Sequence, residues 1–438
     1  MTTVTIAILL VPLLLLAALA LIALRNGEAA EARYPPNGTF TTVEGVRLHH
    51  VERMPPSGGR EAPTLVFVHG ASGNLRDTRL AFEEALAGRY RLIFVDRPGH
   101  GHSERGPQDA HRPAVQARLI GGLLDALGVR HAVAVGHSWG GAVVAQMALL
   151  RPDLIEGLVF IAPATHPWPG GVDWYYDAAA APVFGPLFSL TLAPVVAGQV
   201  APRAIGSVFS PETAPEGYAD AIGLDLLLRP ATFHANARDV ALLKGEVAAA
   251  VSDYPRIAQP AVVITGDKDT VVYPHIHSAG LVRDLPRARL VTLAGAGHMP
   301  HHTRKARVVT EIEALVAQVS GEGAARRLER RRRARPEHLE RLRGGHGLRE
   351  HADAARRSGD EHPLAGGAVS PVQHSERGAV RSREAGQLGV GQRRRGDVVE
   401  STLVADVRER PGGGFGRCLE IEDDPLAPAA PATVRDSL

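Results

Sequence analysis

Gly136-His137-Ser138-Trp139-Gly140 stands between the apolar run Ala132–Val135 and the helix-like stretch Gly141–Leu150. This order places a serine in a tight turn that leads from a buried strand into a helix. Glycine at both ends of the pentapeptide lets strand and helix approach closely, and the turn forces the serine into a strained backbone conformation. We therefore predict that Ser138 projects its hydroxyl above the carboxyl edge of a sheet and acts as a nucleophile.

Partners for this serine follow downstream. A serine hydroxyl needs a base to remove its proton, and the base needs a carboxylate to orient it. The strand-like run Ala261–Thr265 is followed by Asp269, and the run Arg289–Leu293 is followed by His298. The carboxyl ends of parallel strands gather at one edge of a sheet, so we expect these two side chains to lie close to Ser138.

Neighbouring residues compete for the same roles. Asp267 is an alternative acid, although its position favours a turn residue. His301 and His302 are alternatives to His298 as the base. They follow Pro300 at the approach to a final helix, so we predict that both are solvent-facing or rim residues.

The middle of the chain alternates between strand-like and helix-like stretches, which is typical of a mostly parallel, doubly wound sheet flanked by helices. The expected strands also read as nearly continuous apolar runs, as in sheets covered on both faces. Residues 163–255 interrupt this alternation, and we predict that they form a helical cap insertion. The expected elements before it are strands at Thr64–Val68, Arg91–Val95, Ala132–Val135 and Leu158–Ile161, and helices near Thr78–Ala87 and Pro113–Leu127.

Four separated motifs carry a resemblance to a known family. They are His69-Gly70, the loop Asp96–Ser103, the turn around Ser138, and the paired turns at Asp269 and His298. Over residues 39–319 the chain resembles the α/β-hydrolase superfamily, in its serine-nucleophile branch with a single cap insertion. That branch includes esterases, carbon-carbon bond hydrolases and perhydrolase-like enzymes.

The resemblance implies roles for particular residues. Ser138 is the expected nucleophile, Asp269 the acid and His298 the base. The backbone N–H groups of Ala71 and Trp139 are the expected oxyanion hole. Epoxide hydrolases and haloalkane dehalogenases of this superfamily use a carboxylate at the elbow, so a serine there argues against their chemistry.

The aromatic residues Trp168, Trp174 and Tyr175 fall in the predicted cap. They either line the substrate pocket or pack within the cap, and the sequence leaves both interpretations open. In the loop Asp96–Ser103 we expect Asp96 and Arg97 to hold a tight connection by hydrogen bonds. Histidines are numerous, but His100, His102, His275 and His277 match no metal-ligand spacing, so we predict neither a metal nor a cofactor.

The amino-terminal segment differs from the rest. Val4–Leu24 is an almost uninterrupted apolar run, long enough to span a bilayer. We predict that residues 1–25 form a single-pass membrane anchor or an uncleaved signal. Ala30-Glu31-Ala32 is an alternative cleavage site. Arg25 alone does not fix the side of the membrane on which the body lies.

The carboxyl-terminal segment, residues 321–438, is rich in arginine and poor in apolar residues, and we predict a disordered tail. The whole chain carries a formal net charge of +2, so we expect no nucleic-acid partner. Its one cysteine, Cys418, excludes an intrachain disulfide. The predicted organisation is anchor 1–25, core 39–162, cap 163–255, core 256–320 and tail 321–438.

These observations predict a membrane-anchored serine hydrolase that cleaves an ester, thioester or related small-molecule acyl substrate through an acyl-enzyme on Ser138. The same triad serves carbon-carbon bond hydrolysis and acyl transfer, which stay open as alternatives. A non-catalytic apolar-ligand-binding protein on the same fold, or an adaptor acting through the tail, would belong to a different functional class.

Overall fold

The computed structural model describes residues 3–344, and within them the side chains of residues 10–193, 200–323 and 325. Residues 345–438 lie outside this range, and with them most of the predicted disordered tail. The predicted tail begins at residue 321, and here the prediction is wrong for its first part, because the last helix continues through Gly344. Alanine, leucine, glutamate and arginine dominate residues 321–344, and these residues favour helix.

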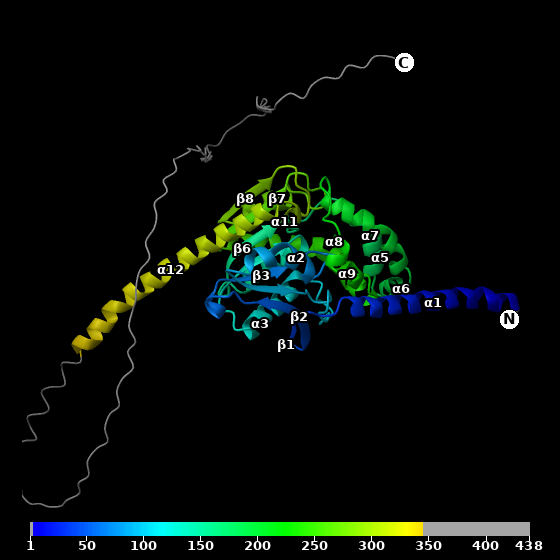
Figure 1. Cartoon of the computed structure of the whole chain (residues 1–438), viewed down its shortest axis with the longest axis horizontal. Coiled ribbons are helices and arrows are strands. Elements are labelled where there is room, and N and C mark those ends of the chain that lie inside the picture. The colour runs from blue at the N-terminus through cyan, green and yellow to red at the C-terminus, as the bar shows by residue number, and fades with distance from the viewer. Residues whose placement is uncertain (1–2, 345–438) are drawn as a thin grey trace, which may run out of the picture. The chain divides into compact units, whose positions relative to one another are not determined.

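One eight-stranded sheet organises the described residues (Figure 1). Its spatial order is β1-β2-β4-β3-β5-β6-β7-β8. Strand β2 runs antiparallel to β1 and β4, and all other neighbours are parallel, which confirms the predicted mostly parallel sheet. The strands are β1 Thr39–Val43, β2 Val46–Arg53, β3 Thr64–Val68, β4 Arg91–Val95, β5 Ala132–His137, β6 Ile155–Ile161, β7 Ala261–Gly266 and β8 Ala288–Leu293.

Helices cover both faces of this sheet, so successive side chains of a central strand enter different cores. In β3, Leu65 and Phe67 pack with α2 and α12, whereas Val66 and Val68 pack with α3 and α4. This double coverage explains why the strands are apolar without alternation. The helices outside the cap are α1 Thr3–Arg33, α2 Leu75–Leu86, α3 Pro113–Ala126, α4 Trp139–Leu150, α10 His277–Asp284, α11 Pro300–Thr303 and α12 Lys305–Gly344, with a 3-10 turn, η1, at Gly59–Glu61.

The predicted cap segment, residues 163–255, forms helices between β6 and β7. Its small core centres on Ala179, Phe188 and Phe233. Figure 1 shows α5, α6, α7 and α9 gathered on the side of the body from which α1 leaves. The elements are α5 Trp174–Ala180, α6 Phe184–Thr191, α7 Ala193–Phe209, α8 Tyr218–Ala221, η2 Leu224–Leu226, α9 Pro230–Ala250 and η3 Val251–Arg256.

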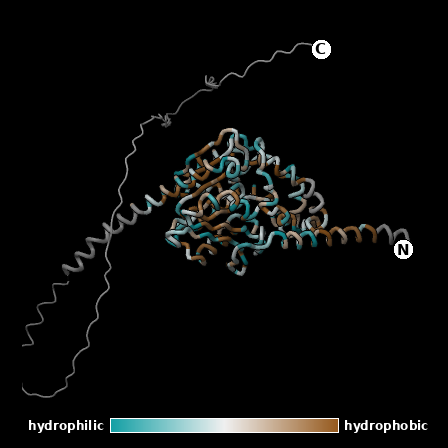
Figure 2. The backbone as a smooth tube through the Cα atoms, in the orientation of Figure 1, coloured by the Kyte–Doolittle hydropathy of each residue, from teal (hydrophilic) through white to brown (hydrophobic). Residues whose placement is uncertain are grey.

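Helix α1 is longer than the predicted anchor. Its segment Leu10–Arg33 contains an 18-residue window with a mean hydropathy of 2.0, which by length and composition is enough to cross a membrane. Figure 2 shows the apolar character of this helix where it leaves the body. Its carboxyl-terminal turns contact the rest of the chain, and Ala30 and Tyr34 bury their side chains against Leu226.

Candidate active site

Ser138 occupies the junction between β5 and α4. Its backbone has φ 50° and ψ −118°, a conformation that side chains rarely adopt. The flanking glycines have no room for a side chain, since a Cβ on Gly136 would lie 2.6 Å from the Gly140 carbonyl oxygen. A Cβ on Gly140 would lie 2.3 Å from the carbonyl oxygen of Val68. Strain of this kind costs on the order of 1–3 kcal/mol and is characteristic of functional turns.

His298 and Asp269 form a buried pair in the loops that follow β8 and β7. His298 Nδ1 donates to Asp269 Oδ2 over 2.8 Å, and the second oxygen of Asp269 accepts the backbone N–H groups of Val271 and Val272 at 2.9 Å each. An ionised carboxylate only accepts hydrogen bonds, so the imidazole proton lies on Nδ1. Nε2 is therefore left with a lone pair that can accept a proton.

His137 brings this pair next to the nucleophile turn. Its Nε2 donates to the carbonyl oxygen of His298 over 3.1 Å, and the two imidazole rings lie 4.9 Å apart. Among the described residues, Ser138 Oγ forms no hydrogen bond to His298 Nε2. Catalytic hydrogen bonds are often long in free enzymes and shorten when substrate binds.

The alternative acid, Asp267, has a different environment. Its Oδ1 accepts the backbone N–H of Gly295 over 2.7 Å, and its other oxygen lies 3.9 Å from the Lys268 ammonium. More than a third of its side chain is exposed. Asp267 thus connects two loops, and the bond to His298 is made by Asp269.

The prediction that His301 and His302 are solvent-facing or rim residues is wrong. Both side chains are buried, and their Nε2 atoms donate to Asp77 of α2 at 3.3 and 2.8 Å. Tyr218 of α8 donates to the same carboxylate over 2.8 Å. Burial alone would raise the pKa of Asp77, but His302 and His301 hold it well below its usual range. A buried anion provided by a distant helix is the physical reason why α11 turns its histidines inward.

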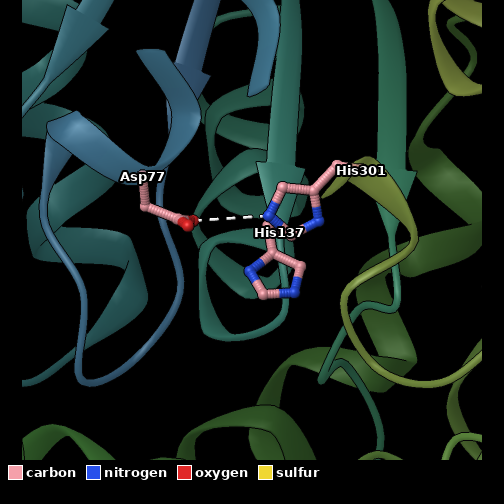
Figure 3. A group of neighbouring side chains, drawn as sticks. All are labelled: Asp77, His137 and His301. Carbon is pink, nitrogen blue, oxygen red and sulfur yellow. Dashed lines mark hydrogen bonds and ion pairs between the residues drawn. The ribbon is translucent and has the colours of Figure 1, made fainter. Parts of the chain in front are cut away.

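Asp77, His137 and His301 also form the group of side chains most similar to a metal site (Figure 3). One donor atom from each lies within 4.8 Å of the others. A histidine nitrogen must be free of its proton to bind a metal. His301 Nε2 donates to Asp77 and His137 Nε2 donates to the His298 carbonyl, so those nitrogens are protonated. The geometry fits a hydrogen-bonded network behind His298 better than an ion site.

The loop after β3 is held beside the nucleophile turn by hydrogen bonds with Arg97. His69 Nε2 accepts the backbone N–H of Arg97, and the Arg97 guanidinium donates to the carbonyl oxygens of His69 and Gly70 at 3.0 Å each. In a trans peptide the C=O and N–H point in opposite directions, so the Ala71 N–H points away from Arg97. A Cβ on Gly70 would lie 3.1 Å from the Ser138 Cβ, which places this loop beside the turn.

Two backbone N–H groups are available near Ser138. Among the described residues, neither the Ala71 nor the Trp139 amide has a hydrogen-bond acceptor. Trp139 is the first residue of α4, where helical N–H groups lack partners and the helix dipole is positive. Such donors stabilise a negative oxygen that develops on an attacked carbonyl.

The pattern of β5, turn and α4, with a histidine–carboxylate pair after later strands, also appears in known proteins. A family model described as the alpha/beta hydrolase fold matches residues 63–305. The chain belongs to this family. An uncharacterized protein of Mycobacterium tuberculosis is 29% identical over 300 residues, which cover 66% of this chain and 84% of the relative.

Solved structures agree on the fold of the hydrolase. The enol-lactonase from Burkholderia xenovorans LB400 has a TM-score of 0.51 and 22% identity, with 64% of this chain and 100% of that chain covered. A membrane phospholipase A described as a bacterial virulence factor has a TM-score of 0.52 and 20% identity, with 72% and 99% covered. The described residues 3–344 thus contain the fold of a hydrolase.

The loop Asp96–Ser103 has the structural role that the sequence suggested. Asp96 accepts the backbone N–H groups of Leu75 and His102 at 2.8 and 2.9 Å, and the side chain of His49 at 2.7 Å. These bonds join β2, β4 and α2 below the site. The histidines of the motif serve this scaffold, since His102 bonds to the carbonyl of Tyr34 over 2.9 Å.

Arg97 also joins the hydrolase core to the cap. Its Nη1 donates to Asp239 of α9 over 2.7 Å, and Arg105 donates to the other oxygen of Asp239 over 2.6 Å. The guanidinium of Arg97 lies 4.2 Å from the ring centre of Trp139, whose indole N–H donates to the Asp239 carbonyl. Burial lowers the pKa of Arg97 to about 10, and Asp239 counteracts this effect. No local sequence pattern marks Asp239, which lies inside an ordinary helical stretch.

Asp239→Asn is expected to destabilise the folded hydrolase by about 3–5 kcal/mol, because it leaves two guanidinium groups facing a neutral amide in a buried site. Urea unfolding of the detergent-solubilised protein, followed by tryptophan fluorescence, measures this loss. The matched control is Asp253→Asn, since Asp253 forms an exposed ion pair with Arg256. Such exposed pairs contribute at most about 1 kcal/mol. Equal losses in both variants would contradict the role of Asp239.

Acid should also destabilise the hydrolase. Burial lowers the pKa of His69 to about 3 and that of His301 to about 4. Both residues regain their ordinary pKa of about 6.5 on unfolding, so the unfolded chain binds more protons below pH 6.5. Between pH 7.5 and 5.5 each residue is expected to lower the free energy of unfolding by about 1.4 kcal/mol. Asp77, with its lowered pKa, stays ionised across this window. Urea titrations at the two pH values test this, and equal stability would contradict it.

The cap reaches the loop after β3 through Ser72, whose φ is 55°. Asn236 of α9 accepts the Ser72 N–H over 2.7 Å, and the Tyr176 hydroxyl lies 3.2 Å from Ser72 Oγ. Of the three residues predicted for the pocket, Tyr175 packs against a member of this contact, Tyr176, at a ring distance of 4.5 Å. Trp168 packs on the core near His277, and Trp174 is 66% exposed.

Proposed function

We propose that this protein is a membrane-anchored serine hydrolase that cleaves an ester, thioester or related acyl substrate through an acyl-enzyme on Ser138. The carrying observation is Ser138 at φ 50° between β5 and α4, with the His298–Asp269 pair bonded to its neighbour His137. A serine hydroxyl can act as a nucleophile in this setting once a base is within reach.

In the proposed reaction, Ser138 Oγ attacks the acyl carbon while His298 Nε2 takes the hydroxyl proton. The amides of Ala71 and Trp139 stabilise the oxyanion, and Asp269 stabilises the imidazolium. The tetrahedral intermediate then collapses, the bond to the leaving group breaks, and His298 returns the proton to that group. Water, deprotonated by His298, attacks the acyl-enzyme in the same way and releases the acid. No step requires a metal or an organic cofactor.

We further propose that α1 is a retained anchor, with residues 39–162 and 256–320 as the catalytic core and residues 163–255 as the cap. The alternative cleavage site, Ala30-Glu31-Ala32, lies inside α1, and Ala30 is 3% exposed. Proteolysis of the folded protein requires an exposed and flexible segment. Glu31 forms an ion pair with Arg229 of the cap at 2.6 Å, which further supports retention. The membrane is thus the proposed location of the hydrolase.

Fluorophosphonate labelling of the full-length protein in detergent tests this function, because the probe reacts only with an activated serine. We expect rapid labelling of one site by intact mass and none after heat denaturation. A p-nitrophenyl ester series of increasing acyl length then measures the size of the acyl site. A folded protein that neither reacts with the probe nor cleaves any ester would contradict the proposal and favour a binding protein.

A further inference from the structure

The cap carries an apolar surface that the catalytic role does not require. Residues 181–192, here called the cap tip, comprise α6 and the loop before it. Four large apolar side chains of this short segment are at least two-fifths exposed, and Val183 reaches 89%. These side chains are Val183, Phe184, Leu187 and Leu192. The sequence contains no Asp, Glu, Lys, Arg or His from residue 178 to residue 202. An exposed apolar patch of this kind indicates a binding surface.

Helix α1 lies directly beside the cap tip. The structure has contacts between α1 and α6, and Figure 1 shows the two helices side by side. One face of α1 is shielded at helical spacing, from the partly buried Leu16 through Ala23 and Ala30 to the buried Tyr34. The other faces are open, and Val11 and Leu13 are each 63% exposed. The exposed apolar part of α1 and the part that packs on the body therefore belong to one continuous helix, with no linker between them.

The length of the apolar run determines how deep in a bilayer the contact between α1 and the cap would lie. A bilayer core of about 30 Å takes about 20 helical residues, which is the whole run from Val4 to Leu24. Leu16 to Ala23 belong to that run and span about 10 Å of helix. If α1 crosses the bilayer, the elements that shield Leu16 to Ala23 lie in the part of the acyl-chain region that is nearest to the body. The apolar cap tip suits that depth, because interfacial helices insert about 5–10 Å.

The cap tip is also connected to the site. Phe188 packs with Ala179 of α5 and Phe233 of α9. The same two helices provide Tyr176 and Asn236, which contact Ser72 beside the proposed oxyanion hole. Trp174, at the start of α5, lies 6.2 Å from the Phe188 ring. Tryptophan is typical of the membrane interface.

We propose that the cap tip docks into the bilayer that holds α1, so that the enzyme draws its substrate, a long-chain acyl ester of a membrane lipid, from that bilayer. The choice of substrate rests on the proposed function. We assign the bilayer to this surface because the cap tip adjoins the apolar helix α1 and because residues 178–202 carry no charge.

Quenching by brominated lipid tests the docking surface without catalysis. The chain has three tryptophans, and Trp139 is buried, Trp168 partly buried and Trp174 exposed. We expect phosphatidylcholine vesicles brominated at carbons near the interface to quench the full-length protein, and Trp174→Phe to remove at least half of that quenching. Aqueous iodide should reach Trp174 poorly. Protection from iodide without quenching by brominated lipid would assign the surface to a second copy of the chain and overturn the proposal.

Catalysis provides the second arm. Val183→Asp combined with Leu187→Asp is expected to lower hydrolysis of dioleoylglycerol in vesicles at least tenfold and to leave hydrolysis of soluble p-nitrophenyl acetate unchanged. The control combines Leu150→Asp and Leu290→Asp, which are 49% and 43% exposed on α4 and β8. Unchanged vesicle hydrolysis in the cap-tip variant would overturn the proposal and leave the proposed function intact. A wild-type chain that is quenched but cleaves neither substrate would support docking and remove the proposed function.

Discussion

Ser138→Ala is expected to lower kcat for a soluble p-nitrophenyl ester by about 10⁶-fold and to abolish fluorophosphonate labelling. The variant has no oxygen to attack the acyl carbon, and His298 has no proton to remove. Only the proposed oxyanion-hole amides and substrate binding stay in place, and together they leave a small residual rate. Steady-state kinetics with full-length protein in detergent measure the loss, and intact mass measures the labelling.

Ser72→Ala provides the control for this experiment. Ser72 lies beside the proposed oxyanion hole and, like Ser138, has a positive φ, but its hydroxyl bonds to Asn236 and Tyr176. We expect the Ser72 variant to keep its labelling site. An unchanged thermal midpoint of the Ser138 variant shows that folding is not the cause of the loss. Labelling of Ser138→Ala at the wild-type rate would refute the nucleophile assignment.

Asp269→Asn is expected to lower kcat by about 10⁴-fold. In the enzyme the carboxylate fixes the imidazole proton on Nδ1 over a 2.8 Å bond. An asparagine amide that donates to Nδ1 favours the other tautomer, in which Nε2 carries the proton and cannot act as a base. The neutral amide also fails to stabilise the imidazolium. The effect should appear in kcat, with little change in the labelling site.

Asp267→Asn is the matched control, two residues away. Asp267 accepts the Gly295 N–H, and an asparagine carbonyl oxygen preserves that bond. We expect its kcat to stay within about twofold of the wild type, as is usual for surface substitutions. A larger loss for Asp267→Asn than for Asp269→Asn would reverse the assignment of the acid.

The elements closest to the site are the ones that local sequence predicts best. The strands at Thr64–Val68 and Arg91–Val95 coincide with β3 and β4, because fully buried strands have a continuous apolar signal. Strands β1 and β2, at the sheet edge, are missing from the prediction. Their mixture of threonine, arginine and histidine is not an apolar run. Antiparallel pairing of β2 with β4, and of β1 with β2, gives them their place.

Contacts between distant segments could not be predicted from local sequence patterns. His301 and His302 read as surface residues because Asp77, the anion that buries them, is on α2 near the other end of the core. Asp239 and Asn236 also lie in a plain helical stretch, and only the packing of α9 against Arg97 and Ser72 reveals their roles. Motifs predict residues whose geometry is set by a local turn, whereas partners brought together by tertiary packing leave no local pattern.

The indole of Trp139 has a consequence for exchanging caps among relatives. Its ring N–H donates to the Asp239 carbonyl on α9, while its backbone amide belongs to the turn that follows Ser138. A foreign segment between β6 and β7 with another residue at this position would remove the counterion of Arg97, and it would have to place a backbone carbonyl at the same point to accept the indole N–H. In functional chimeras of this hydrolase, the cap should therefore be exchanged together with residues 97, 105 and 139, which all bond to Asp239.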